Sequence, residues 1–228
     1  MSVFNDYKKE LMDAAHNERI RLALSRAIGS YRTNASNALT KFPHTIKLAE
    51  EVREIKARAI DDMEKLAQQA SEAIVANHGK AYIARTASEA LEIIGNLVGK
   101  SKLIVKAKSM TSEEISLREH LEGMGNEVCE TDLGEFIIQK LHSKPMHILS
   151  PAIHVPREDV ATLLSQITGE KLPPDDIARM VATARTLLRE KFIQADIGIS
   201  GANVVAADTG TLFIIENEGN ARLATALP

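Results

Sequence analysis

The chain has 228 residues, of which 44% are hydrophobic and 4% aromatic, and it carries a formal net charge of −3. This length suits one large domain or a domain with an appendage, and the scarcity of aromatic residues predicts a core of aliphatic side chains. The small negative charge argues against nucleic acid or an anionic membrane as the main partner, because both recruit strongly basic surfaces.

Cysteine content and hydropathy bear on the cellular compartment and on membrane insertion. A single cysteine, Cys129, allows neither an internal disulfide nor an iron–sulfur cluster held by this chain alone, since such clusters normally take four thiolate ligands. A lone cysteine is typical of the reducing cytosol. The N-terminal segment is too polar for a signal peptide, and no apolar run reaches the ~20 residues that cross a bilayer. We therefore expect a cytoplasmic protein without membrane insertion.

Residues 1–78 carry apolar side chains at helical spacing. A first helix is expected to end at Gly29, followed by a polar, turn-prone segment over 30–42 and a second long helix over 44–77. We expect these residues to form a helical lead that precedes an α/β domain over 79–228.

After the lead, short apolar runs alternate with helical segments. The expected strands cover 80–84, 102–106, 126–130 and 146–150. The expected helices cover 88–94, 111–124, 134–141, a segment beginning near 156, and 175–192. Alternation of this kind predicts an α/β fold with a mainly parallel sheet flanked by helices.

The stretch 196–222 is rich in glycine and polar residues. Two apolar runs of strand length, 204–207 and 212–215, lie between glycines that are expected to turn the backbone sharply. These glycines are Gly198, Gly201, Gly210 and Gly219. Polar groups at strand ends are how α/β proteins usually build a ligand site, although a pair of strands closed by solvated turns would show the same pattern. The candidate ligand-binding residues are Gly201, Asn203, Asp208, Thr209, Gly210, Glu216 and Asn217.

A second candidate site follows the strand expected over 102–106. It combines lysines, hydroxyl groups and a helix N-terminus, which together suit an anion. A structural role is also open, because Thr111 and Glu114 have the spacing of a capping box. The candidate ligand-binding residues here are Lys106, Lys108, Ser109 and Thr111.

Two further strand ends carry titratable groups. The acidic stretch 130–135 either caps the following helix or binds a cation or ribose hydroxyls. His154 follows the strand expected over 146–150, where an imidazole could act as acid, base or ligand. No spacing typical of a zinc site is present, so no metal site is expected.

Glu216 is the candidate catalytic residue. A carboxylate beside glycines at a strand end could serve as a base or a covalent nucleophile. Glu218 lies two residues away and would raise one of the two pKa values if both carboxylates face the same way. Simple solvation, or pairing with Arg222, is the structural alternative.

Four of these stretches resemble the lactate-utilization (LUD) domain family. They are K-S-M-T-S-E-E (108–114), E-T-D-L-G-E-F-I (130–137), H-I-L-S-P-A-I-H (147–154) and the glycine-rich stretch over 198–222. Among members of that family, the N-terminal half of the iron–sulfur B subunits is the most similar. The resemblance implies a fold like that of the sugar-phosphate isomerase and CoA-transferase superfamily (NagB/RpiA/CoA transferase-like), and a role in oxidising L-lactate to pyruvate within a complex.

The resemblance also implies cofactors and partners. Family members of this type continue into a ferredoxin-like region with cysteine clusters, whereas this chain ends at Pro228. We expect no cofactor in this chain and iron–sulfur clusters in a C-terminal region outside it; a shortened chain and a natural short form both stay open. The expected partners are other subunits of a lactate-oxidation complex, a small anionic or nucleotide-like ligand, and further copies of the chain.

The favoured hypothesis is thus a ligand-binding and assembly domain of an electron-transfer complex, not necessarily active in isolation. The alternative is an enzyme similar to CoA-transferases or sugar-phosphate isomerases that uses Glu216. The turn over 216–219 resembles the glutamate-bearing turn of CoA-transferases, but it contains an additional acid, Glu218.

Overall fold

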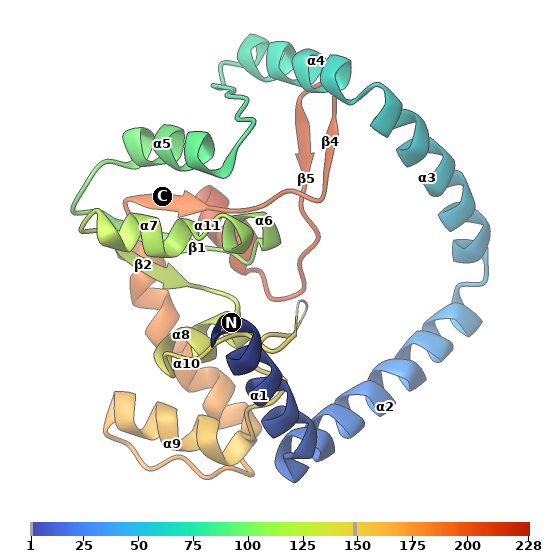
Figure 1. The fold of residues 1–228 in the computed structure, drawn as a ribbon. Helices are drawn as coiled ribbons and strands as arrows, with labels where there is room; N and C mark the ends of the chain where they lie inside the picture. Colours follow the sequence, from blue (N-terminus) through green and yellow to red (C-terminus); the bar gives the residue numbers. More distant parts are fainter. Residues whose placement is uncertain (1, 148–149) are drawn as a thin grey trace. The chain divides into compact units, whose positions relative to one another are not determined.

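The computed structural model describes residues 2–147 and 150–228 (Figure 1). The chain divides into two compact units: the first consists of Met1–Leu48 and Ile137–Arg185, and the second of Ala49–Phe136 and Thr186–Pro228. The boundary expected between residues 78 and 79 stays a prediction.

The secondary structure is mostly helical, with short strands. The helices are α1 (Ser2–His16), α2 (Glu18–Lys41), α3 (His44–Asp61), α4 (Met63–Ala76), α5 (Ala87–Val98), α6 (Met110–Glu114), α7 (Leu117–Gly123), α8 (Leu133–Lys140), α9 (Arg157–Thr168), α10 (Ile177–Gln194) and α11 (Asn220–Ala226). The strands are β1 (Leu103–Lys106), β2 (Glu127–Glu130), β3 (Ile197–Ile199), β4 (Val204–Ala206) and β5 (Thr211–Phe213).

The second unit contains a parallel sheet with the strand order β2-β1-β3. Lys106 at the end of β1 lies opposite Glu130 of β2 on one side and Ile199 of β3 on the other. All three strands therefore end at the same edge of the sheet. The α/β class, with a parallel sheet flanked by helices, is confirmed.

One face of this sheet packs against α5 and α7. Its core includes Ile104 and Leu121, neither with any exposed surface, together with Val98, Leu117 and Val128. Burying an aliphatic side chain of this size contributes about 2 kcal/mol, so this cluster is a main source of stability for the second unit.

Helix α11 covers the opposite face of the sheet. Ile197 and Ile199 pack with the α5–α7 core, so Gly198 between them points the other way. A Cβ atom on Gly198 would lie 1.5 Å from the carbonyl oxygen of Ala224 in α11. Gly198 was expected to turn the chain; instead it lies within a strand, where the missing side chain lets the helix backbone approach.

The helical lead differs in detail from the prediction. Helix α2 runs through Gly29 to Lys41, so the expectations of a stop at Gly29 and of a turn-prone segment over 30–42 were wrong. A helix interior tolerates one glycine at a cost of about 1 kcal/mol. The helix ends at Lys41 with Phe42 as its C-cap, because the following Pro43 disfavours helical backbone at Phe42. The single helix expected over 44–77 is interrupted at Asp62.

Two predicted strands do not form in the described residues. The segment 80–84 has no strand partner, and Tyr82 and Ile83 are exposed. A run of β-forming residues needs a neighbouring strand for its backbone hydrogen bonds, which this segment lacks. Within 146–150, Met146, His147 and Ser150 are not in a strand, whereas 148–149 lie outside the described residues.

The two apolar runs of the glycine-rich stretch form an antiparallel hairpin of β4 and β5 beside α4 (Figure 1). Asn77 at the end of α4 donates a hydrogen bond from Nδ2 to the Thr209 carbonyl, 3.1 Å away. Gly210 takes a left-handed φ of +68°, and a Cβ there would lie 2.9 Å from the backbone nitrogen of Ile74. This glycine both turns the hairpin and lets it contact the helix.

Among the described residues, no helix has the length and apolar character needed to cross a membrane.

Candidate functional site

The carboxyl edge of the parallel sheet contains a buried ion pair. Lys106 Nζ lies 2.9 Å from a carboxylate oxygen of Glu130, and the two side chains are 1% and 5% exposed. The Arg118 guanidinium of α7 lies 3.7 Å from the other Glu130 oxygen. Burial raises the pKa of the Glu130 carboxyl, and the Lys106 ammonium opposes that rise. Lys106 therefore contacts a carboxylate of its own chain rather than solvent.

Hydrogen bonds to Thr131 hold this edge together. The Thr131 hydroxyl donates to the carbonyl oxygen of Lys106 at 3.0 Å, and the Thr131 amide donates to the same oxygen at 2.9 Å. Asn220 at the start of α11 donates from Nδ2 to the Thr131 hydroxyl at 3.4 Å. The ends of β1 and β2 and the first turn of α11 are thereby connected.

Lys108, two residues beyond the end of β1, lies between two carboxyl groups. Its Nζ is 2.6 Å from Glu135 of α8 and 3.6 Å from Glu113 of α6. Burial alone lowers the pKa of Lys108, but the hydrogen bond and charge of Glu135 outweigh it and raise that pKa above its ordinary value. The Lys108 side chain is 18% exposed, so part of it is in contact with solvent.

Ser109 and Gly201 lie side by side at the same edge. Ser109 caps α6, because its hydroxyl accepts a hydrogen bond from the Ser112 amide at 3.3 Å. A Cβ on Gly201 would lie 2.9 Å from that hydroxyl oxygen, so glycine leaves room for it. Thr111 lies inside α6; the expected capping box starting at Thr111 was wrong, since the helix begins at Met110 and Ser109 takes the capping position.

The other glycine-rich candidates serve the hairpin in this structure. Asp208, Thr209 and Gly210 form the turn that contacts α4. The side chain of Asn203 accepts a hydrogen bond from the Ile215 amide at 2.8 Å, which closes the open end of the hairpin. No contact joins these four residues to Lys108 in the part of the chain that is described; their ligand-binding role stays a prediction.

The Glu216 carboxylate is bound by Arg222 of α11. One carboxylate oxygen accepts from the Arg222 amide at 2.9 Å, and the other lies 3.2 Å from the Arg222 guanidinium. The neighbouring Asn217 is exposed. These contacts match the structural alternative of pairing with Arg222, and the catalytic role of Glu216 stays a prediction.

His154 belongs to the first unit. Its side chain is partly buried, and its Nδ1 atom is buried without a hydrogen-bond partner among the described residues. No group of three or more His, Cys, Asp or Glu side chains within 2–147 and 150–228 is arranged to hold a metal ion.

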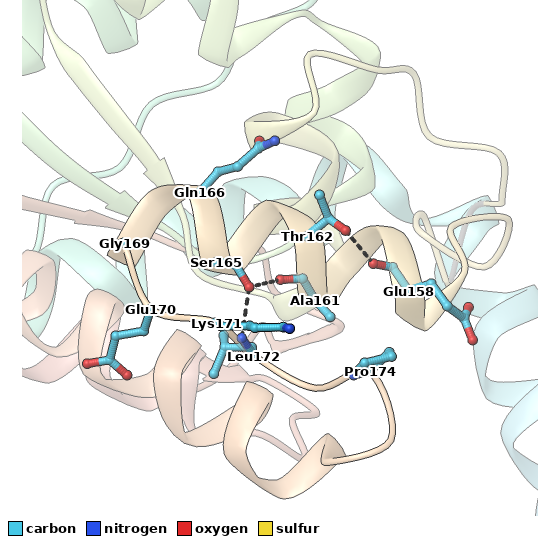
Figure 2. A pocket seen from close by; sticks show the side chains of 10 residues that line it. All are labelled: Glu158, Ala161, Thr162, Ser165, Gln166, Gly169, Glu170, Lys171, Leu172 and Pro174. Atoms are coloured by element: carbon cyan, nitrogen blue, oxygen red, sulfur yellow. Dashed lines mark hydrogen bonds between the residues drawn. The ribbon is translucent and has the colours of Figure 1, made fainter.

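The first unit also contains an open pocket of about 500 Å³ between α9 and the loop that follows it (Figure 2). The Ser165 hydroxyl donates to the Ala161 carbonyl at 2.6 Å and accepts from the Leu172 amide at 3.0 Å. The Thr162 hydroxyl donates to the Glu158 carbonyl at 2.9 Å. These polar groups form hydrogen bonds with the local backbone. The better candidate site is therefore the strand-end cluster, the charged residues at the carboxyl edge of the parallel sheet: Lys106, Lys108, Glu113, Arg118, Glu130 and Glu135.

The family of this chain follows from its sequence relationships. A model of the LUD domain family matches residues 67–228, which include the whole parallel sheet. The chain belongs to the LUD domain family. No solved structure matches this LUD chain.

Curated relatives of this LUD chain carry the name Lactate utilization protein B. The protein from Bacillus licheniformis is 38% identical over 228 residues, covering 97% of this chain and 47% of its own length. The one from Bacillus subtilis is 37% identical, with the same coverage of both chains. The one from Oceanobacillus iheyensis is 35% identical over 224 residues, again with that coverage. The LUD chain thus spans about half the length of the curated relatives it matches.

Several charged residues of the cluster were not among the predicted site residues. Glu113, Glu130 and Glu135 lie in stretches that were singled out. Helix capping, or binding of a cation or ribose hydroxyls, was expected of 130–135, and no role was expected of Glu113. Arg118 was not singled out. One sequence signal could have identified these lysine–glutamate pairs. Lysines lie at and just after the end of one strand (Lys106 and Lys108), and acids lie at and just after the end of the next strand of a parallel sheet.

Proposed function

We propose that this chain is the ligand-binding and assembly domain of a protein for lactate utilisation, acting in the oxidation of L-lactate to pyruvate together with other subunits. Membership of the LUD family and the name of the curated relatives support this proposal. Electron transfer would be carried out by those other subunits or by regions outside this chain. Iron–sulfur clusters do not fit this chain, because its one cysteine, Cys129, is buried and clusters normally take four thiolates.

The observation that carries the ligand-binding proposal is the position of Lys108. Its side chain is partly exposed and holds an ammonium group beside the Glu135 carboxylate, at the edge where parallel α/β sheets bind ligands. A small 2-hydroxy acid has a carboxylate that needs a cation and a hydroxyl that needs an acceptor. Lys108 supplies the cation, and Glu135 supplies the hydrogen-bond acceptor. Lys106 is too deeply buried in its own ion pair for direct contact, so we assign it a supporting role.

Replacing Lys108 by methionine tests this assignment. We expect the Kd for L-lactate, measured by calorimetry, to rise at least tenfold, because a charge-assisted hydrogen bond to the carboxylate is lost. The loss leaves Glu135 without its cation, so the free energy of unfolding should fall by about 1–2 kcal/mol while the chain stays folded.

Lys100→Met is the matched control, since Lys100 is exposed and lies outside the cluster. It should bind L-lactate like the wild type. Unchanged affinity in Lys108→Met, or no binding of L-lactate by the wild type, would contradict the proposal.

The assembly part of the proposal rests on α2. This helix has no buried residue over its 24 positions, and its side chains Ile28 and Leu39 are 46% and 48% exposed. The two are eleven residues apart, so they share one face of the helix. We expect a second copy of the chain to cover this face. Light scattering should show that the wild type is a dimer and that the double variant Ile28→Glu with Leu39→Glu is a monomer. A monomeric wild type would contradict self-association through α2.

A further inference from the structure

The two carboxyl partners of Lys108 differ in exposure and in distance. Glu135 is 8% exposed and lies 2.6 Å from the ammonium, whereas Glu113 is 33% exposed and lies 3.6 Å away. Glu113 holds the weaker and more accessible of the two contacts.

The elements that carry the two carboxyl groups also differ. Glu135 lies in the first turn of α8, where its amide donates to the Asp132 side chain at 3.1 Å. Glu113 lies in α6, a helix of five residues that is followed by Ser116 with a left-handed φ of 54°. A helix this short has little stability of its own, so Glu113 can move away from Lys108 at lower cost than Glu135.

Glu113 also faces a second carboxyl group. Burial and then the charge of Glu135 raise the pKa of Glu113, while Lys108 and, more weakly, Lys106 lower it. The charge of Asp132, just before α8, contributes to raising the pKa of Lys108. When Glu113 takes up a proton, its attraction to Lys108 is lost and the repulsion from Glu135 ends.

We propose that Glu113 competes with a ligand's carboxylate for Lys108, so that anion binding is coupled to proton uptake by Glu113. This inference rests on the proposed ligand site at Lys108. An anion at Lys108 removes the favourable partner of Glu113 and adds a negative neighbour. Both effects favour the protonated form of Glu113 in the complex.

The affinity for an anion depends on pH through the protonation of Glu113. Ligand binding moves the pKa of Glu113 further in the direction in which burial and Glu135 already raise it. Between the pKa of the free protein and that of the complex, each binding event takes up as much as one proton. Affinity for an anion therefore rises as the pH falls through that window, by at most tenfold per pH unit.

The test is calorimetric titration of L-lactate into the wild-type chain, Glu113→Gln and Glu114→Gln between about pH 5.5 and pH 8. Glutamine keeps the shape of residue 113 and removes its charge. We expect Glu113→Gln to bind L-lactate about tenfold more tightly than the wild type at pH 8, with little dependence on pH. Glu114→Gln removes the same charge from the next position of α6, where Glu114 is exposed, and should follow the wild-type pH profile.

The outcomes separate this inference from the function on which it rests. Equal affinity and equal pH dependence in the wild type and Glu113→Gln would overturn the role of Glu113 and leave the lactate site standing. The same gain in Glu114→Gln would reduce the effect to general electrostatics and also overturn the inference. Absence of L-lactate binding in the wild type and in Glu113→Gln at every pH would overturn both proposals.

Discussion

Gly198→Ala is expected to unfold the second unit or to detach α11 from the sheet. The added Cβ would lie 1.5 Å from the carbonyl oxygen and 2.6 Å from the carbonyl carbon of Ala224. Both are backbone atoms, so no side-chain rotation relieves the clash. Because Ala221 and Ala224 are buried against the sheet, moving α11 exposes apolar surface on both elements. We expect a loss above about 4 kcal/mol in urea-induced unfolding, which is a large share of the stability of a typical domain.

Gly29→Ala is the matched control for this substitution. Gly29 lies inside α2, and a Cβ there meets no atom within 4 Å. Alanine favours the helix over glycine by about 1 kcal/mol, so this variant should be slightly more stable than the wild type. A Gly198→Ala chain that unfolds at the wild-type urea concentration would contradict the close packing of α11 on β3.

Lys106→Met should lower the free energy of unfolding by about 3 kcal/mol. The substitution leaves the Glu130 carboxyl buried without its ion pair at 2.9 Å, while the Arg118 guanidinium lies farther away, at 3.7 Å. Methionine fills much of the lysine stem's volume, so loss of the charge, rather than a cavity, should dominate. Urea unfolding monitored by circular dichroism measures the change.

The double variant Lys106→Met with Glu130→Gln provides the control. Removing both charges leaves no unpaired ion, so much of the lost stability should return. A single Lys106→Met variant as stable as the wild type would show that the ion pair does not hold the two strand ends together.

The central strands were predictable from sequence because they are apolar, short and buried. The runs around Ile104 and Val128 form β1 and β2 where expected. The segment 80–84 has a similar local pattern but remains unpaired. The local pattern alone did not separate these segments, because a strand also needs a neighbouring strand to pair with. β3 was missed because Gly198 was expected to turn the chain, whereas the approach of α11 is what requires glycine.

The candidate site was predictable only in part. Lys108 and Ser109 follow a predicted strand and precede a helix, so their position at the sheet edge could be inferred. Their partners come from other elements: Glu135 is 27 residues from Lys108, and Gly201 approaches Ser109 from beyond β3. Strand order and register bring these groups together, and neither follows from local spacing. The hairpin residues were predicted to bind a ligand from their polar turn alone, and that role stays a prediction.

An NMR titration of the isotope-labelled wild-type chain with L-lactate tests the central claim most directly. If the carboxyl edge of the parallel sheet is the ligand site, the largest shifts in amide resonances will fall in 108–113 and 131–135. Shifts confined to the α9 pocket over 158–174, shifts confined to the hairpin turn over 208–210, or no shifts at all would contradict a lactate site at Lys108.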